Sequence, residues 1–298
     1  MGDHHAADRP LRLVAYLLPV ISEGAYALVA ATIAERLGRP VEVIVDTRRS
    51  GPGIDGRPFS DGEVDLALVC APSWCWLRDR DPPAARLVGV APAPDDIRSA
   101  GEAWYFSEVL VRREHPAAGL DDLHGATWAV NDPASLSGYH AVVAHVHDPR
   151  LVWSGAHSAS AAMVRAGRAD AAAVDALAWR RLQREDPSGS GDLRAITTWG
   201  PHPTQPLVAA SHMAADDIQR SRDALLSLSG HPTLDAAGLS GFAPVDDGVY
   251  GPHVPGLPDR RTASPSPDGT SEAGRRSRRS GPPAAAGGTP TGPYSTQA

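Results

Sequence analysis

Hydrophobic and polar positions follow one another along the chain in a pattern that predicts strands and helices in turn. Residues 12–18 form a short apolar run typical of a buried strand, and apolar side chains at helical spacing predict a helix over 23–37. By the same criteria, further strands are expected at 41–45, 64–69, 104–111, 126–130, 150–153 and 169–174, and further helices from about 137 and at 158–166, 175–184 and 216–229. Strands that alternate with helices favour an α/β fold with open, mainly parallel sheets flanked by helices.

Composition narrows the classes of protein that this fold can represent. The formal net charge is −7, and all 28 basic residues are arginines, a usage typical of a GC-rich genome. An acidic balance argues against broad nucleic-acid binding. The only two cysteines of the chain, Cys70 and Cys75, are too few for a zinc site, and we expect both to be buried or half-buried thiols.

The two ends of the chain differ in composition from the rest. As written, the N-terminus carries neither a signal peptide nor a lipid-bearing cysteine, which predicts a cytoplasmic protein, or an extracytoplasmic one if the true start lies upstream. The first apolar run is too short to span a bilayer, so we expect no stable membrane insertion. Residues 254–298 are rich in Gly, Pro, Ser and Arg with almost no large apolar side chains, which predicts a disordered tail.

A turn with the sequence Asp-Pro-Ala-Ser-Leu-Ser-Gly-Tyr, at residues 132–139, carries the most chemical information. It follows a predicted strand and opens a predicted helix, where backbone N–H groups and the helix dipole favour an anion. The groups that could bind one are the hydroxyls of Ser135 and Ser137 and the N–H groups of Leu136, Ser137 and Gly138. An ordinary N-cap followed by a glycine turn uses the same residue types, so the pattern alone leaves both interpretations open.

Two further polar side chains lie next to predicted strands and helices. His157 precedes a helix and could donate a hydrogen bond, or a charge when protonated, to the anion, or it could be a surface histidine. Asp175 follows a strand and could bind an amine or hydroxyl at the other end of a ligand, or it could cap the next helix. For both residues the two alternatives remain open.

Aromatic residues and other histidines give weaker signals. Trp74, Tyr105 and Tyr16 could pack on the organic part of a ligand or belong to the core, and Ser107 could orient the anion or mark a hinge. The His-Val-His-Asp run at 145–148 follows a helix near a loop, where we expect a surface turn and no metal site. Neither a nucleotide-binding glycine loop nor a nucleophile elbow occurs in the sequence.

Taken in order, several segments resemble the phosphonate-binding, PhnD-like branch of the ABC-transporter substrate-binding proteins. The resemblance covers about residues 11 to 252. Its signature, in which Ser-Thr-Ser-Gly-Tyr is usual, matches residues 135–139, with Leu136 at the position of the Thr. The other matching segments are 37–43, 63–68 with Trp74, 105–111, 120–125, His157 with 166–175, and 241–250.

This resemblance implies a two-lobed fold of the type II periplasmic-binding-protein class. Lobe 1 would comprise 10–106 and 206–253, and lobe 2 would be inserted as 107–205. The implied function is capture of a small oxyanion such as phosphonate, phosphate or phosphite between the lobes, with the 135–138 turn as the binding element. The implied partners are this small anionic ligand and an ABC permease. No cofactor, metal or nucleic acid is expected, and the protein is expected to be a monomer. The alternative is a cytoplasmic enzyme or metabolite sensor on the same fold, acting on a small carboxylate or another anion.

Overall fold

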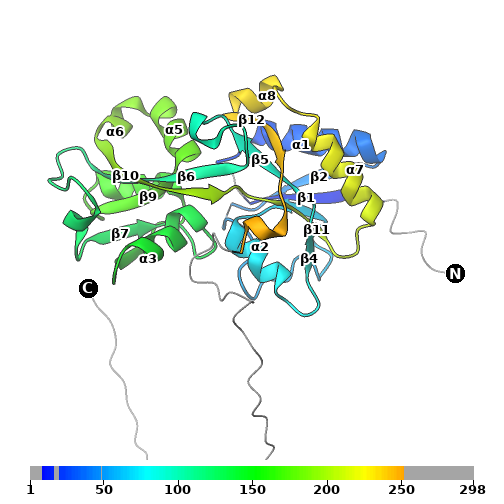
Figure 1. Ribbon diagram of the computed structural model, residues 1–298, viewed down its shortest axis with the longest axis horizontal. Coiled ribbons are helices and arrows are strands. Elements are labelled where there is room, and N and C mark those ends of the chain that lie inside the picture. The colour runs from blue at the N-terminus through cyan, green and yellow to red at the C-terminus, as the bar shows by residue number, and fades with distance from the viewer. Residues whose placement is uncertain (1–8, 17–19, 48, 252–298) are drawn as a thin grey trace, which may run out of the picture. The chain divides into compact units, whose positions relative to one another are not determined.

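A computed structural model describes residues 9–16, 20–47 and 49–251 of the chain (Figure 1). Two five-stranded sheets organise these residues, and we call the part of the chain built on each sheet a lobe. The sheet of the first lobe has the strand order β2-β1-β3-β11-β4. Its strands are β1 (Leu11–Ala15), β2 (Val41–Val45), β3 (Leu66–Leu68), β4 (Ala85–Leu87) and β11 (Leu207–Ala210).

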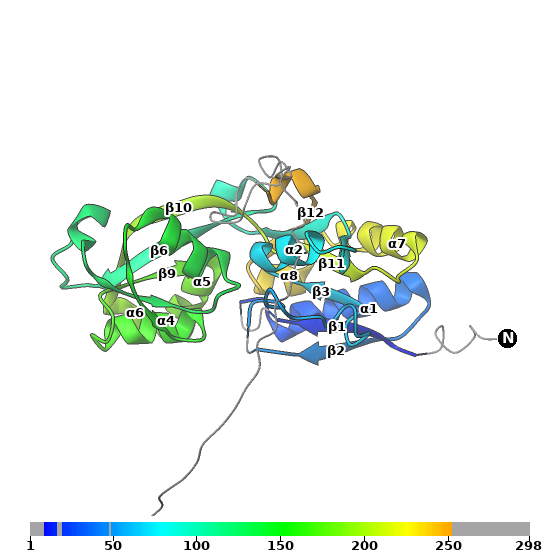
Figure 2. The same ribbon diagram turned by 90° about the horizontal axis from the view of Figure 1, so that it is seen from below.

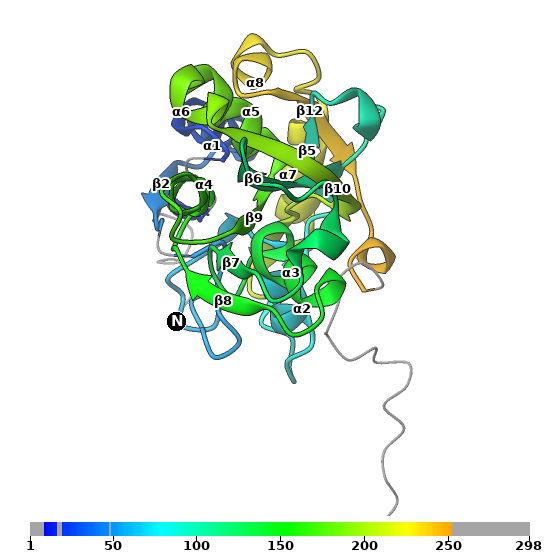
Figure 3. The same cartoon turned by 90° about the vertical axis from the view of Figure 1, so that its left-hand side faces the viewer.

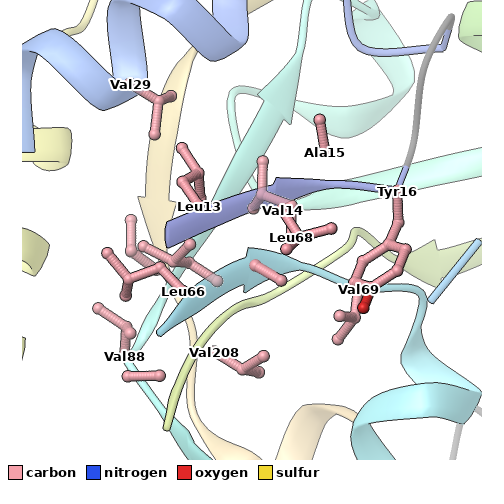
Figure 4. Packing of buried hydrophobic residues seen from close by; sticks show 14 of the residues in the cluster. Leu13, Val14, Ala15, Tyr16, Val29, Leu66, Leu68, Val69, Val88 and Val208 are labelled. Atoms are coloured by element: carbon pink, nitrogen blue, oxygen red, sulfur yellow. The ribbon is translucent and has the colours of Figure 1, made fainter. Parts of the chain in front are cut away.

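The first helix, α1 (Glu23–Leu37), forms where the apolar periodicity predicts it. The Ser22 hydroxyl accepts a hydrogen bond from the Ala25 N–H at 3.3 Å, and Gly38 ends the helix with φ 66°, a conformation that glycine adopts without steric cost. Its buried face packs in the same hydrophobic cluster as the side chains of β1 and β3. Figure 4 shows Val29 of this helix together with the strand residues of the cluster.

The sheet of the second lobe has the order β10-β6-β9-β7-β8. Its strands are β6 (Trp104–Arg112), β7 (Thr127–Val130), β8 (Arg150–Trp153), β9 (Ala171–Asp175) and β10 (Leu193–Pro203). Two helices cover opposite faces of this sheet: α3 (Ala141–His145) packs in one hydrophobic cluster and α4 (His157–Arg165) in another (Figure 3). The second cluster also includes residues of α5 (Ala176–Glu185).

Each sheet is more mixed than the mainly parallel sheet predicted from the sequence. In the first lobe β1 pairs in parallel with β2 and β3, whereas β11 pairs antiparallel with β3 and β4. In the second lobe β7 pairs in parallel with β8 and β9, whereas β6 pairs antiparallel with β9 and β10. The antiparallel pairs arise because the segments that cross between the lobes join the sheets as strands.

Two long strands, β6 and β10, connect the lobes. They pair antiparallel from Trp104 opposite Pro203 to Arg112 opposite Leu193, with register shifts between Ala195 and Thr197 and between Trp199 and His202. Figure 2 shows both strands extending between the second lobe and the first. They form a hydrogen-bonded ribbon between the two sheets.

Several short elements had no counterpart in the sequence-based prediction. The helix α2 (Ala71–Arg78) covers residues for which no helix was predicted. A two-stranded sheet joins β5 (Val90–Pro94) to β12 (Leu239–Pro244), and these strands contain prolines. The helix α7 (Ala215–Leu226), by contrast, forms where a helix was predicted at 216–229. The remaining helices are α6 (Pro187–Gly191) and α8 (Pro232–Ala236), and short turns lie at Ile97–Ser99, Leu120–Leu123, Leu136–His140 and Asp247–Val249.

The predicted tail, residues 254–298, lies outside the described residues. Among the residues that the structure does describe, none forms a helix that is both long and apolar enough to cross a membrane.

Candidate ligand-binding site

A cavity of about 180 Å³ lies between the two lobes. It is found where strands of both sheets end at their carboxyl edges, which is where ligands bind in open α/β sheets. Its polar lining includes Thr47, Arg49, Ser50, Asn131, Asp132, Ser135, Ser137, His157, Ser158, Asp175, Arg181, Glu185 and Gln205. The small volume suits a ligand of a few heavy atoms, since pockets for drug-sized ligands are roughly 300–1,000 Å³.

The turn at 135–138 contributes two hydroxyl groups to this cavity. Ser135 and Ser137 line it, and both are 2% exposed. Ser135 is the N-cap of the π-helical turn Leu136–His140, and its Oγ accepts a hydrogen bond from the Gly138 N–H at 3.1 Å. Because that bond uses Oγ as an acceptor, the proton of the Ser135 hydroxyl is available for a ligand oxygen. The N-cap and the binding-site interpretations of this serine are therefore compatible.

Backbone N–H groups in the turn have partners within the protein. The Leu136 N–H donates to Cys70 Sγ at 3.3 Å, and the Gly138 N–H donates to Ser135 Oγ. Neither Leu136 nor Gly138 lines the cavity, and the Leu136 side chain is buried in the core of the first lobe. The turn thus presents mainly side-chain hydroxyls rather than the row of N–H groups expected from the sequence.

His157 begins α4 and stands beside these hydroxyls. Its Nε2 lies 3.4 Å from Ser137 Oγ and 3.5 Å from Asn131 Nδ2. Burial lowers the pKa of His157 to about 4, against an opposing contact with the backbone of Ala173. The imidazole is therefore neutral near pH 7 and can offer a ligand a hydrogen bond but no full charge.

Asp175 ends β9 and both caps a helix and lines the cavity. Its Oδ1 accepts hydrogen bonds from the N–H groups of Leu177, at 2.7 Å, and Ala178, at 3.3 Å. Burial raises the pKa of Asp175 to about 6, although these two hydrogen bonds act to lower it. The carboxyl group therefore titrates just below neutral pH.

The shifted pKa of Asp175 predicts a pH-dependent stability difference. A carboxyl whose pKa is raised in the folded state stabilises the fold when protonated, and this stabilisation is lost as the pH rises through about 6. Asp175→Asn keeps a good N-cap without the charge, so its stability relative to the parent should rise by up to about 3 kcal/mol between pH 4 and pH 7. Thermal unfolding of the ligand-free proteins at both pH values measures this difference.

Asp186 provides a matched control for that measurement. It is the N-cap of α6, but hydrogen bonds from the Gly189 N–H and Arg165 hold its pKa below the ordinary value. Asp186→Asn should accordingly lose stability relative to the parent as the pH rises, the opposite sign. If the stability of Asp175→Asn relative to the parent is constant or falls as the pH rises, the pKa of the buried Asp175 carboxyl is not raised.

Tyr105 and Ser107 lie behind the 135–138 turn, outside the cavity lining. Ser107 Oγ donates to the Ser137 carbonyl at 3.3 Å and lies 3.1 Å from His202 Nε2. Burial raises the pKa of Tyr105, while hydrogen bonding with Ser137 opposes this effect. Both residues belong to β6, so they support Ser137 from the strand that joins the lobes.

The two other predicted aromatic residues have different surroundings. Tyr16 follows β1 and lines the cavity, and Figure 4 shows it beyond the end of the strand. Trp74 lies in α2 away from the cavity, and its Nε1–H donates to Asp247 Oδ1 at 2.9 Å. Its position supports the core alternative rather than contact with a ligand.

Several lining residues were not singled out from the sequence. Asn131 and Asp132 directly follow β7, so the rule that located Asp175 could also have indicated them. Asp132 Oδ2 accepts a hydrogen bond from the Ser50 hydroxyl of the first lobe at 2.6 Å. Arg49 is exposed in a loop and Arg181 pairs with Glu185 within α5, and no sequence signal marks either arginine.

A residue of the cavity wall has a buried polar atom without a partner among the described residues. Asn131 is 5% exposed, and its Oδ1 is a buried atom without a hydrogen-bond partner in the described part of the chain. Buried polar groups are normally satisfied, so an exception at the wall of a cavity favours a ligand or water there. Within the described residues, no group of three or more His, Cys, Asp or Glu side chains is placed to hold a metal ion. Both cysteines are free and buried.

Two α/β lobes joined by a two-stranded ribbon, with a polar cavity where they meet, define a solute-binding protein. The model of the family described as periplasmic substrate-binding proteins of phosphonate ABC transporters matches residues 13–250, and the chain belongs to this family. The family resemblance predicted from the sequence is thus confirmed. The family serves transport and is not an enzyme family, and it implies a ligand and a permease as partners in a normally periplasmic setting.

Solved structures show the same fold at low sequence identity. A binding-protein component of an ABC phosphonate transporter from Pseudomonas aeruginosa is 18% identical, with 82% of this chain and 84% of that chain covered and a TM-score of 0.65. PhnD1 from Prochlorococcus marinus, in complex with methylphosphonate, is 15% identical, with 82% and 95% covered and a TM-score of 0.67. A chloride-bound protein from Xanthomonas citri is 19% identical, with 80% and 92% covered and a TM-score of 0.61.

Proposed function

We propose that this protein captures a small oxyanion in the cavity between its lobes and delivers it to an ABC permease. The observation that carries the proposal is the convergence of the Ser135 and Ser137 hydroxyls, the neutral His157 and the exposed Arg49 on one small cavity. Hydroxyl and imidazole donors fix the orientation of an anion, and guanidinium groups supply the opposite charge. Phosphonate, phosphate, phosphite and sulfonate all have this chemistry.

The carboxyl groups of the cavity suit a polar or cationic substituent on the ligand. Asp175, Asp132 and Glu185 place carboxyl groups in the lining. Glu185 is paired with Arg181 at 2.6 Å, whereas Asp175 is held by backbone N–H groups. An amine or hydroxyl on the organic part of the ligand could therefore be bound by Asp175, as considered from the sequence.

The lobe boundaries belong to the same proposal. We assign residues 10–106 and 206–253 to the first lobe and 107–205 to the second, with the hinge in the crossing strands. The pairing of β6 with β9 from Ser107 onward supports this division, as does β11, which begins at Leu207 in the first sheet. A ligand that contacts both lobes would favour the closed arrangement over an open one.

The partner and compartment follow from the proposed transport role. We propose a monomer that works outside the cytoplasmic membrane, needs no cofactor and binds no nucleic acid; the net charge of −7 supports the last point. A cytoplasmic location is the competing prediction. Fractionation of cells that express the gene from its native locus distinguishes the two.

Ligand-dependent stabilisation of the full chain tests the function. A ligand present at 100 times its Kd stabilises the folded state by about 2.7 kcal/mol, so thermal unfolding with methylphosphonate, phosphate, phosphite, methanesulfonate and acetate ranks the anions. Ser135→Ala/Ser137→Ala should weaken binding of the best anion by about a hundredfold or more, since each lost hydrogen bond to a charged group costs about 1.5–3 kcal/mol. Titration calorimetry measures that loss directly.

Ser221→Ala is the control for this double variant. Ser221 is fully buried in α7, and its hydroxyl donates to the Asp217 carbonyl far from the cavity lining. It should leave the affinity unchanged. The proposal fails if none of the oxyanions stabilises the protein, or if the Ser135→Ala/Ser137→Ala protein binds the best anion as tightly as the parent.

A further inference from the structure

One leucine of the 135–138 turn belongs to the core of the opposite lobe. Leu136 follows β7 of the second lobe, yet its side chain is 0% exposed and lies in the hydrophobic cluster built on the first sheet. Leu177, at the start of α5, joins the same cluster and is 6% exposed. Both side chains therefore pack across the boundary between the lobes.

A hydrogen bond reinforces the contact at Leu136. Its N–H donates to Sγ of Cys70, a residue of the first lobe that is 3% exposed, at the N-terminus of α2. Burial raises the pKa of the Cys70 thiol to about 12, so the thiol is protonated near neutral pH. Close by, the Ser50 hydroxyl of the first lobe donates to Asp132 of the second.

All of these contacts join the two lobes through protein atoms alone. Burial of the Leu136 side chain is the strongest of these contacts. Burying a leucine shifts the equilibrium between separated and contacting lobes toward contact by roughly ten- to a hundredfold. A threonine at this position would have fewer apolar atoms to bury and a hydroxyl that needs a partner.

We propose that Leu136 and Cys70 form an interlobe clasp that holds the lobes closed without a ligand and determines which donors a ligand meets. In the closed protein the clasp occupies the Leu136 N–H, so an anion is bound at this turn through the Ser135 and Ser137 hydroxyls. The proposal rests on the proposed function only in that the turn is the ligand site. Because the clasp must part before the cavity opens, it slows both entry and release of the ligand.

Chemical labelling of Cys70 measures the opening of the clasp. Cys75→Ser leaves Cys70 as the only thiol of the chain, and the serine can still donate to the Tyr250 carbonyl that Cys75 Sγ contacts at 3.7 Å. The rate of reaction with excess N-ethylmaleimide, in the absence of ligand and at several low urea concentrations, then reports exposure of Cys70. Weak urea dependence identifies opening of the lobes, and strong dependence identifies global unfolding.

In this Cys75→Ser background, Leu136→Thr should accelerate labelling by roughly ten- to a hundredfold, with weak urea dependence. Leu136→Met, which nearly conserves volume, should label at close to the parent rate. Leu66→Ala is the control for general destabilisation, because Leu66 is equally buried in the same cluster but comes from β3 of the first lobe. Leu66→Ala should accelerate only the part of Cys70 labelling that depends strongly on urea, which proceeds through global unfolding.

Two results would overturn the clasp: equal labelling rates for Leu136→Thr and the parent, or labelling of the parent only through global unfolding. Protection of Cys70 by methylphosphonate and phosphate is measured separately. If neither anion slows labelling while Leu136→Thr still accelerates it, the clasp stands and the oxyanion function does not. If an anion protects Cys70 while Leu136→Thr has no effect, the function stands without the clasp.

Discussion

Gly138→Ala is expected to abolish measurable anion binding. A Cβ atom at this position would lie 2.1 Å from Asn131 Oδ1 and 2.9 Å from His157 Cε1, far inside any van der Waals contact. Both neighbours line the cavity, so relief of the clash must move them or the turn that carries Ser135 and Ser137. The loss should exceed that of Ser135→Ala/Ser137→Ala, because one added methyl group displaces several ligand contacts together.

Calorimetric titration with the best anion, paired with thermal unfolding, checks this expectation. Overpacking costs about 1–3 kcal/mol of stability, so the variant should remain folded. Gly191→Ala is the control, since a Cβ on Gly191 in α6 would meet no atom within 4 Å. A folded Gly138→Ala protein that binds the anion with parental affinity would show that the turn is not part of the ligand site.

Asp65→Asn is expected to cause a large loss of stability. The Asp65 side chain is fully buried, and its carboxylate accepts hydrogen bonds from Arg9 at 2.6 and 2.7 Å, from the Arg12 N–H at 2.8 Å and from His212 at 2.9 Å. Loss of one partner of a buried ion pair costs about 3–5 kcal/mol. Because the Arg9 side chain is 37% exposed, we expect about 3 kcal/mol.

The pH dependence of that loss gives a second readout. Burial acts to raise the pKa of Asp65, but hydrogen bonds from Arg9, Arg12 and His212 together hold the pKa below its ordinary value. A carboxyl with a lowered pKa stabilises the fold above its unfolded pKa, and this stabilisation disappears as the pH falls below that value. Denaturant unfolding at pH 7 and at acidic pH should therefore show a penalty for Asp65→Asn that shrinks on acidification.

Asp216→Asn serves as the matched control. The Asp216 side chain is 82% exposed and lies 3.9 Å from Arg220 on the surface of α7, where an ion pair is worth about 0–1 kcal/mol. Its effect on stability should be small at every pH. Equal effects of the two substitutions would mean that the Asp65 carboxylate does not hold β1 against β3.

Local sequence signals predicted the elements that position the site. The Ser22 cap and the glycine that ends α1 were readable because capping depends on neighbouring residues. The helix α2 was missed, although Pro72 in its first turn is a helix-start signal. The strands β5 and β12 contain prolines and form only because each has the other as a partner.

The site was predictable to the extent that it depends on strand ends. Ser135, Ser137 and Asp175 were singled out where they follow predicted strands, and His157 where it precedes a predicted helix. All four line the cavity, where ligands bind at the carboxyl ends of strands. The arginines of the cavity approach from a loop and from the middle of a helix, positions that only the tertiary fold determines. The engagement of Leu136 by the opposite lobe likewise depends on contacts between segments far apart in sequence.

The antiparallel ribbon of β6 and β10 limits how the two lobes can move. Two strands joined edge to edge by hydrogen bonds bend readily out of their common plane, but sliding one along the other would break many bonds at once. Ser107 and His202 lie within this ribbon and contact each other, close to the register shift after Trp199. The lobes should consequently separate by a hinge rotation about a single axis through the ribbon. The cavity should then open on the side away from the ribbon.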